Sequence, residues 1–182
     1  MSKRVLLMTG DGGEALEVFY PYYRVQEAGH TVVLAAPRKK TVHTVIHDRE
    51  PDWDISTEKP GYRIEADAAY ADVRPEEFDA LILSGGRAPE YARLDEYAPR
   101  IVRAFWDSGK PIGAICHGGL FFVAAGIDLT GRTLTATRGI RPELERLGAK
   151  YLTDRVVVDR NLVTAQSWRD LPGFMREFMR IL

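Results

Sequence analysis

Short apolar runs alternate with segments of helical length along this chain of 182 residues, and only a few folds accommodate that alternation. Runs that are apolar at successive positions suit central strands, because both faces of such strands are covered. We predict strands at Val5–Met8, Thr31–Ala36, Phe78–Leu83, Pro111–Ile115, Thr133–Thr137, Val156–Val158 and Leu162–Thr164. We predict helices at Glu14–Ala28, Asp95–Ser108, Pro142–Leu147 and from Leu171 onward. This order indicates an α/β fold with a doubly wound, mainly parallel, flavodoxin-like sheet, whose ligand site lies beyond the carboxyl ends of its strands.

The first predicted helix has one side that is rich in apolar residues. That side carries Leu16, Phe19, Tyr20, Tyr23 and Val25. Pro21 lies inside the same segment and lacks a backbone N–H, so we expect it to bend or interrupt the helix.

The length of the chain suffices for one domain with a substantial core, and we expect residues 1–182 to form it. Regular alternation stops between residues 37 and 70, where T-V-H-T-V-I, which we expect to form a strand or one arm of a hairpin, is followed by polar and acidic residues. We interpret this segment as an inserted loop or flap. Its acids lack the central glycine and terminal glutamate of a calcium loop, so we expect solvated surface there and no metal site.

The overall charge is nearly balanced, with 25 basic and 26 acidic residues and a formal net charge of −1. We therefore expect neither nucleic acid nor an anionic membrane as a partner. No apolar segment approaches the ~20 residues of a membrane span, and the apolar run near the N-terminus is too short for a signal peptide. A single cysteine cannot form an internal disulfide, which favours a reducing cytoplasm.

That cysteine, Cys116, lies in the stretch G-K-P-I-G-A-I-C-H-G-G-L-F-F-V-A-A, where a predicted strand ends and an apolar helical segment begins. Ala114 and Gly118 flank it with the small residues that a sharp strand-to-helix elbow requires. The helix N-terminus would lower the pKa of the thiol from about 8.5. A buried, inert cysteine is the alternative, but the elbow pattern favours a nucleophile.

Glu14, the pair Gly85 and Gly86, and Cys116 each follow a predicted strand, so we expect them to converge on one crevice. The Glu14 carboxyl could hydrogen-bond to the sulfur and shuttle a proton; alternatively it only stabilises the first helical turn. The backbone N–H groups of Gly86 and His117 are candidate oxyanion donors. The His117 side chain should leave the elbow in another direction, so it acts either as a base or as an orienting or interface group.

Four motifs in order resemble the PfpI/ThiJ superfamily, which has a class I glutamine amidotransferase-like fold. They are E-A-L-E-V-F-Y-P at 14–21, F-D-A-L-I-L-S-G-G-R-A-P-E at 78–90, G-K-P-I-G-A-I-C-H-G at 109–118 and V-V-D-R-N-L-V-T-A at 157–165. The long segment with H-D at 47–48 and E-K-P-G-Y-R at 58–63 resembles the branch that contains plant glyoxalase or deglycase members.

The resemblance implies roles for these residues. By similarity, Cys116 is the nucleophile, Glu14 the acid beside it, His117 the adjoining histidine and Gly86 the oxyanion donor, next to Gly85. In the PfpI branch, the residue that matches Glu90 reaches the histidine of a neighbouring subunit. The resemblance therefore implies a homo-oligomer, a dimer or a hexamer, with Arg87 and Glu90 near the interface. A simple helix-start acid is the alternative for Glu90.

Several further residues are candidates for the pocket wall. His47 could line the pocket from the inserted segment, although a surface or loop-capping histidine is the alternative. Thr137 and Arg138 occupy a site that is often Tyr-Pro in the peptidase branch, and they would flank the pocket together with Ser84 and Ala15, which also depart from the family pattern.

The resemblance implies, first, a cofactor-independent glyoxalase or deglycase that converts small 2-oxoaldehydes, such as methylglyoxal and glyoxal, into hydroxy acids through a hemithioacetal on Cys116. The second candidate is a PfpI-type intracellular cysteine peptidase, with His117 as the base and Glu90 of a partner chain in support. The third is a non-catalytic oxidative-stress protein in which Cys116 is oxidised. A low-pKa thiol beside an acid suits all three.

Overall fold

The computed structural model describes all residues from Met1 to Leu182 and is built on a seven-stranded sheet of order β10-β11-β7-β6-β1-β2-β5. The strands are β1 (Arg4–Met8), β2 (Thr31–Ala36), β5 (Ala68–Ala69), β6 (Ala80–Leu83), β7 (Ile112–Ile115), β10 (Val156–Asp159) and β11 (Leu162–Ala165). Neighbouring strands are parallel except β10, which pairs antiparallel with β11 at the edge. The predicted doubly wound, mainly parallel α/β fold is confirmed.

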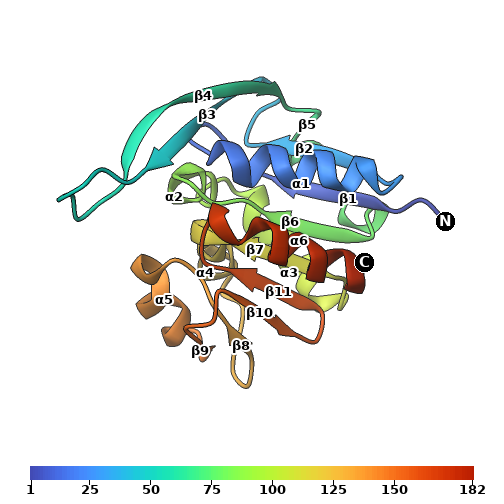
Figure 1. Cartoon of the computed structure of the whole chain (residues 1–182). Coiled ribbons are helices and arrows are strands. Elements are labelled where there is room, and N and C mark those ends of the chain that lie inside the picture. Colours follow the sequence, from blue (N-terminus) through green and yellow to red (C-terminus); the bar gives the residue numbers. More distant parts are fainter.

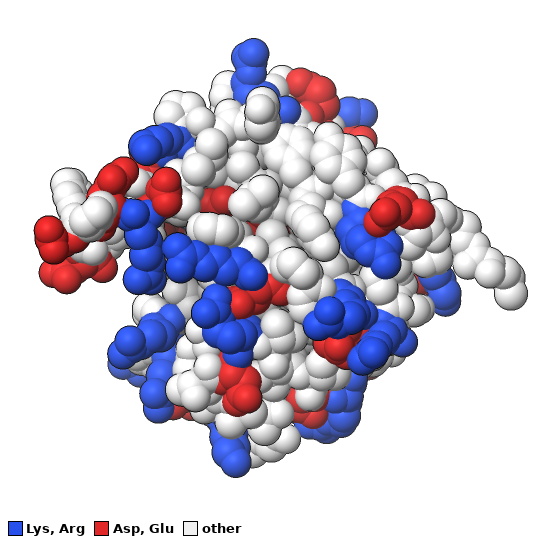
Figure 2. All heavy atoms as spheres, in the orientation of Figure 1, with Lys and Arg blue, Asp and Glu red and all other residues white.

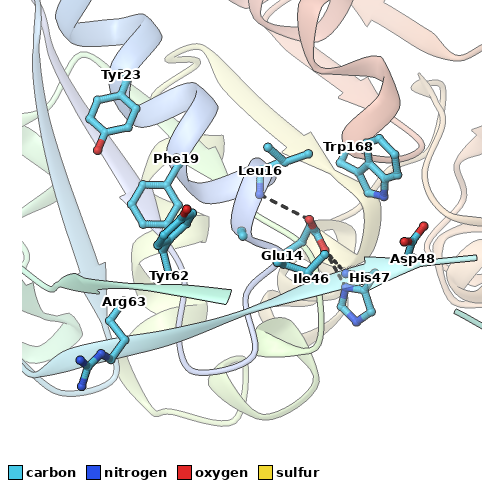
Figure 3. Close-up of a pocket in the computed structure, with 11 residues that line it drawn as sticks. Glu14, Leu16, Phe19, Tyr23, Ile46, His47, Asp48, Tyr62, Arg63 and Trp168 are labelled. Carbon is cyan, nitrogen blue, oxygen red and sulfur yellow. Dashed lines mark hydrogen bonds and ion pairs between the residues drawn. The ribbon is translucent and has the colours of Figure 1, made fainter. Parts of the chain in front are cut away.

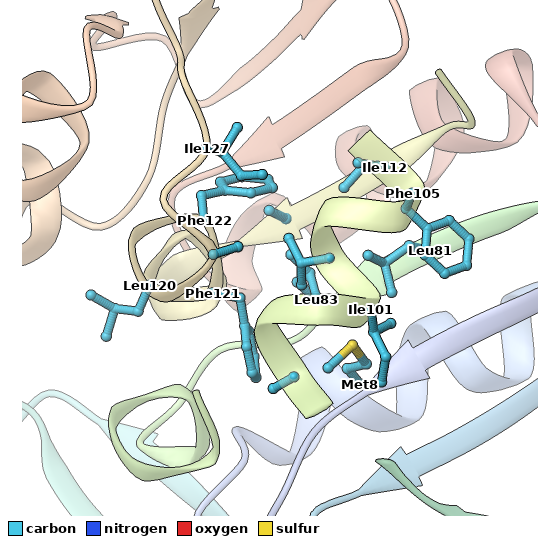
Figure 4. Close-up of a cluster of buried hydrophobic side chains, with 14 of the residues drawn as sticks. Met8, Leu81, Leu83, Ile101, Phe105, Ile112, Leu120, Phe121, Phe122 and Ile127 are labelled. Atoms are coloured by element: carbon cyan, nitrogen blue, oxygen red, sulfur yellow. The ribbon is translucent and has the colours of Figure 1, made fainter. Parts of the chain in front are cut away.

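Helices cover both faces of this sheet (Figure 1). Helices α1 (Ala15–Glu27) and α6 (Leu171–Ile181) pack on one face, and α3 (Tyr97–Asp107) and α4 (Leu120–Ala125) pack on the other. Successive residues of a strand point to opposite faces, so Leu6 and Met8 join the α3–α4 core, whereas Val5 and Leu7 join the α1–α6 core. Figure 4 shows the first of these cores. Burial on both faces explains why β1 is apolar at every position from Val5 to Met8.

The smaller elements lie outside this sandwich. They are α2 (Ala88–Ala92), α5 (Arg141–Arg146), β8 (Thr133–Leu134), β9 (Lys150–Tyr151) and the 3₁₀ turns η1 (Tyr70–Asp72), η2 (Pro75–Glu77), η3 (Cys116–Gly119), η4 (Arg138–Ile140) and η5 (Trp168–Asp170). The strand predicted near 133–137 is β8, which pairs with β9 instead of joining the central sheet. No helix of the structure is both long and apolar enough to cross a bilayer.

The segment at 37–70 is more regular than the sequence indicates. It forms an antiparallel hairpin of β3 (Thr41–Asp48) and β4 (Thr57–Glu65), which extends past the carboxyl-end side of the sheet (Figure 1). Backbone hydrogen bonds from Gly12 N to His43 O (2.7 Å) and from Val45 N to Gly13 O (2.9 Å) attach its base to the loop after β1. The hairpin therefore forms a wall beside the ends of β1 and β6.

Helix α1 turns a different side toward the sheet from the side that its sequence predicts. Leu16, Tyr20 and Tyr23 are 49%, 38% and 59% exposed. The buried residues of α1 are Ala15, Glu17, Val18, Pro21 and Val25. The apolar side predicted from Leu16 to Tyr23 is thus the outer side, and a carboxylic acid lies on the inner side. Pro21 does not interrupt α1, which continues to Glu27.

Candidate active site

The cysteine elbow forms as predicted. Cys116 directly follows β7 and opens the 3₁₀ turn η3, which leads into α4. Its backbone has φ = 58°, in the left-handed region that disfavours residues with a side chain. A side chain at Gly118 would collide with the carbonyl of Leu83, so the turn needs glycine there. Strain of this kind persists where the surrounding structure fixes it, and it concentrates at functional sites.

The carboxyl group beside the sulfur belongs to Glu17, not to Glu14. Glu17 is fully buried, and its Oε2 accepts a hydrogen bond from the backbone N–H of Gly85 at 3.0 Å. Its Oε1 is buried without a hydrogen-bond partner, and the carboxyl lies beside Cys116, because a side chain placed at Gly85 would meet both Glu17 Oε2 and Cys116 Cβ. The inward rotation of α1 produces this arrangement, because it points Glu17 at the end of β7.

Glu14 occupies a different position. It caps the N-terminus of α1, and its Oε1 accepts a hydrogen bond from Leu16 N at 3.4 Å. Its Oε2 accepts a hydrogen bond from His47 N at 2.9 Å and lies 2.8 Å from His47 Nδ1. Figure 3 shows this carboxylate turned toward the hairpin. The predicted hydrogen bond from Glu14 to the sulfur is therefore replaced by a helix cap and an ion pair with His47.

The charges of this site are coupled. Burial, and next the nearby charge of Glu14, raise the pKa of Glu17 to about 8, so Glu17 is mostly protonated at neutral pH. Burial, and next the charge of Glu17, raise the pKa of Cys116, while the N–H groups of Gly86 and His117 lower it. The predicted net lowering of the thiol pKa is therefore wrong. An ionised Glu17 and a thiolate oppose each other, so the proton of Glu17 helps the sulfur to ionise.

Two backbone N–H groups, those of Gly86 and His117, lie near the Cys116 side chain and lower the pKa of its thiol. Gly86 has φ = 72°, and a side chain there would collide with the backbone of Glu14. Donors placed in this way can also stabilise negative charge on an oxygen of a group bound to the sulfur.

His117 lies closer to the sulfur than expected, because its Nδ1 is 3.4 Å from Cys116 Sγ. Burial lowers the pKa of His117, so the ring is neutral at neutral pH. The charged side chains of Glu90, Arg87 and Glu143 act on this ring as well. The half-buried ring therefore lies beside the half-buried Cys116 and within reach of the charges of these side chains.

Arg87 and Glu90 form an ion pair, with Arg87 Nε and Nη2 at 3.1 and 3.0 Å from Glu90 Oε2. Both side chains are exposed. Arg138 is also exposed and lines neither of the two larger cavities; its place in the wall of a pocket at Cys116 stays a prediction. The nearest link from its segment is the hydrogen bond from Thr137 N to Cys116 O at 3.4 Å.

Two large cavities flank the hairpin. One of about 680 Å³ is walled by Glu14 and His47 together with Phe19, Tyr62 and Trp168 (Figure 3). The other, of about 800 Å³, is more polar, and its lining includes Asp11, His43, Glu58, Arg87 and Glu90. His47 thus lines a cavity from the hairpin. Cys116 lines neither of them, and no group of three or more His, Cys, Asp or Glu side chains is placed to hold a metal ion.

A cysteine in a left-handed elbow at the carboxyl ends of a parallel sheet defines an α/β protein of the nucleophile-elbow type. The chain belongs to the DJ-1/PfpI family, whose sequence model matches residues 3–181. The family predicted from the four motifs is confirmed.

Named relatives support this assignment. A deglycase from Thermococcus kodakarensis is 40% identical over 179 residues, which cover 98% of this chain and 99% of that protein. Protein/nucleic acid deglycase 2 of Escherichia coli is 34% identical over 183 residues, covering 100% and 99% of the two chains. The crystal structure of Drosophila melanogaster DJ-1beta has the same fold, with a TM-score of 0.82 at 23% identity over 100% of this chain and 91% of that one.

Proposed function

We propose that the protein is a glyoxalase/deglycase that converts small 2-oxoaldehydes such as methylglyoxal and glyoxal into hydroxy acids without a cofactor. This proposal rests on one observation: the buried, protonated Glu17 lies beside the thiol of Cys116, whose backbone is strained. Isomerisation of a 2-oxoaldehyde needs one nucleophile and one group that moves a proton, and these two residues supply both. Relatives that match this chain over nearly its whole length are named deglycases, which supports the same reading.

The first step adds the sulfur to the aldehyde carbon. The thiolate of Cys116 forms the C–S bond, and the aldehyde oxygen takes the electron pair of its former π bond. The N–H groups of Gly86 and His117, which lie near the Cys116 side chain and lower the pKa of its thiol, stabilise the developing charge. Glu17 then gives its proton to this oxygen, which yields a neutral hemithioacetal and a carboxylate.

The second step moves a proton between adjacent carbons. The Glu17 carboxylate removes the proton from the former aldehyde carbon, which gives an enediolate with its negative charge on the neighbouring oxygen. The hydroxyl proton passes to that oxygen, and Glu17 returns its own proton to the neighbouring carbon, so that the former aldehyde oxygen becomes the thioester carbonyl. The product is a hydroxyacyl thioester on Cys116. Water hydrolyses the thioester, releases the hydroxy acid and restores the thiol. A free thiol of this kind persists in a reducing cytoplasm, which is where we place the reaction.

A cysteine peptidase is the second candidate, because His117 Nδ1 lies 3.4 Å from the sulfur and could act as the base. In that mechanism His117 is indispensable and Glu17 is not. In the glyoxalase mechanism the reverse holds. An oxidative-stress role without catalysis requires neither residue for turnover and predicts only oxidation of Cys116.

We also propose that the chain forms a homo-oligomer, a dimer or a hexamer, with Arg87 and Glu90 near the contact. Both side chains are exposed, and both act electrostatically on His117, which adjoins Cys116. A second chain over this ion pair would narrow the access to Cys116 and exclude water from the reaction.

The test measures lactate and glycolate release from methylglyoxal and glyoxal, without glutathione or added metal, for the native protein, Cys116→Ala and His117→Ala. We expect turnover by the native protein, none by Cys116→Ala, and substantial turnover by His117→Ala. Lack of turnover by the native protein would contradict the glyoxalase proposal. Cleavage of a denatured protein substrate that depends on His117 would favour the peptidase.

A further inference from the structure

The hairpin β3–β4 is a separate two-stranded sheet, and it is attached to the rest of the molecule unevenly. Its base is fixed by the backbone hydrogen bonds of Gly12 and Gly13 to β3 and by Asp11, whose Oδ1 accepts a hydrogen bond from His43 N at 2.9 Å. Farther out along β3, His47 makes the last hydrogen bonds from the hairpin to the body of the protein. The outer half of the hairpin therefore depends on His47 for its polar attachment.

His47 lies between two carboxyl groups. Its Nδ1 is 2.8 Å from Glu14 Oε2, and its Nε2 is 3.3 Å from Glu58 Oε2. Only the protonated imidazole can donate a hydrogen bond from both ring nitrogens. Glu14 is 2% exposed and is held by its capping hydrogen bond to Leu16 N, so it offers a fixed acceptor on α1. The arrangement suits an imidazolium that joins α1, β3 and β4.

The contacts of His47 with Glu14 and Glu58 lie beside the proposed reaction site. The hairpin supplies residues to the walls of both large cavities, among them Ile46, His47 and Tyr62 to one and Glu58 to the other. Movement of its outer half would change both cavities, whereas the base of the hairpin stays attached to the loop that pairs with Gly86.

We propose that His47 is a positioning residue, whose imidazolium between Glu14 and Glu58 holds the outer half of the hairpin against the start of α1 and releases it on losing its proton. The inference goes beyond the proposed activity and does not depend on it, because it concerns the attachment of the hairpin alone. Glu14, which the sequence places beside the sulfur, then serves as the anchor of this attachment.

The charges around His47 determine how the attachment of the hairpin depends on pH. Glu14 faces it from the start of α1, Glu58 faces it from β4, and Asp48 is its neighbour on β3. On the opposite side stands His117, which is neutral at neutral pH, while Arg87 acts on Glu58. The hydrogen bond with Glu14 is the main cause of a raised pKa of His47. The attachment is therefore complete below about pH 6.5 and is lost as pH rises through the raised pKa.

The test is amide hydrogen exchange of the full chain between pH 6 and pH 8.5, corrected for the intrinsic pH dependence of exchange. In the native protein we expect the protection of residues 46–48 and 57–59 to fall about tenfold or more across this range. In His47→Gln, which cannot bind both carboxylates, we expect low protection at both pH values. Strand β11 serves as the reference, because an intact fold keeps its protection unchanged.

His43→Gln is the matched control, since His43 is exposed on the same strand and its side chain makes no hydrogen bond. We expect it to behave as the native protein does. If β11 also loses protection in His47→Gln, Glu58→Gln replaces it as the test, and we expect a partial loss at pH 6. Hairpin protection that is equal in the native protein, His47→Gln and Glu58→Gln at both pH values would overturn the proposal.

Steady-state kinetics distinguishes a positioning role of His47 from a purely structural one. If the native protein turns over methylglyoxal, we expect His47→Gln to raise KM severalfold while kcat changes less than twofold, because the sulfur and Glu17 are untouched. The exchange experiment needs no turnover, so its outcome is independent of the proposed glyoxalase activity.

Discussion

Cys116 combines a reactive side chain with a backbone conformation, φ = 58°, that costs an L-residue about 1–2 kcal/mol. Glycine has no such cost. We therefore expect Cys116→Gly to be more stable than Cys116→Ala by about 1 kcal/mol in urea unfolding, although both lack the nucleophile. Equal stability of the two variants would show that the elbow is unstrained in solution.

Glu17 gives a second prediction at this scale, concerning stability and pH. Its pKa is raised from 4.5 to about 8 in the folded protein, so the folded state holds a proton that the unfolded chain releases at lower pH. The free energy of unfolding of the native protein, relative to that of Glu17→Gln, should then fall by up to about 1.4 kcal/mol per pH unit as the pH rises between these two pKa values. We expect Glu17→Gln to be the more stable protein at pH 8. Parallel pH profiles for the two proteins in urea unfolding would contradict a buried protonated Glu17.

Only part of this site could be predicted from the sequence. Cys116, Gly86 and His117 are adjacent to glycine-rich strand ends, so the turn chemistry marks them. Glu17 has no such mark, because a charged residue in a helix is normally read as exposed. The spacing of Val18, Pro21 and Val25 contains the signal, since it places Glu17 at the edge of a buried stripe.

At the scale of elements, the orientation of α1 decides which acid meets the sulfur. Val18 is fully buried in the α1–α6 core, whereas Tyr23 is 59% exposed. We expect Val18→Ala to lower the free energy of unfolding by about 1–2 kcal/mol and Tyr23→Ala to change it by no more than about 0.5 kcal/mol. Urea unfolding that gives the opposite order would mean that α1 presents its other side to the sheet.

The hairpin shows a different limit of sequence reasoning. Val42 and Thr44 are buried and His43 is exposed, which is the alternation of a half-covered strand. The connection from 49 to 56 carries none of the short turn signals of a tight hairpin, so the second strand could not be paired with the first from sequence. Its attachment through His47 depends on contacts between segments far apart in the chain.

For the whole molecule, the order of the strands brings the site together. Strands β1, β6 and β7 are neighbours, so the loops that carry Gly12, Gly86 and Cys116 meet at one edge of the sheet. The alternation of strands and helices predicted this convergence, but it could not give the order of strands in the sheet, because that order depends on long-range pairing. Basic and acidic side chains are interspersed on the face shown in Figure 2.

Assembly yields a prediction at this scale. We expect light scattering after size exclusion to give a dimer or hexamer of the 20.5 kDa chain, and Glu90→Ala to dissociate at higher protein concentration than the native protein does. A matched control is Glu96→Ala, because Glu96 forms an exposed ion pair with Arg100 elsewhere on the surface. A monomer at every concentration would contradict the proposed homo-oligomer.

The central claim is that Glu17, and not Glu14, moves the proton for Cys116. The most direct measurement compares kcat for lactate release from methylglyoxal by the native protein, Glu17→Gln and Glu14→Gln, with Cys116→Ala as the blank. We predict that Glu17→Gln loses about 10²-fold or more in kcat, while Glu14→Gln loses less than about tenfold. A large loss in Glu14→Gln together with an active Glu17→Gln would contradict the account.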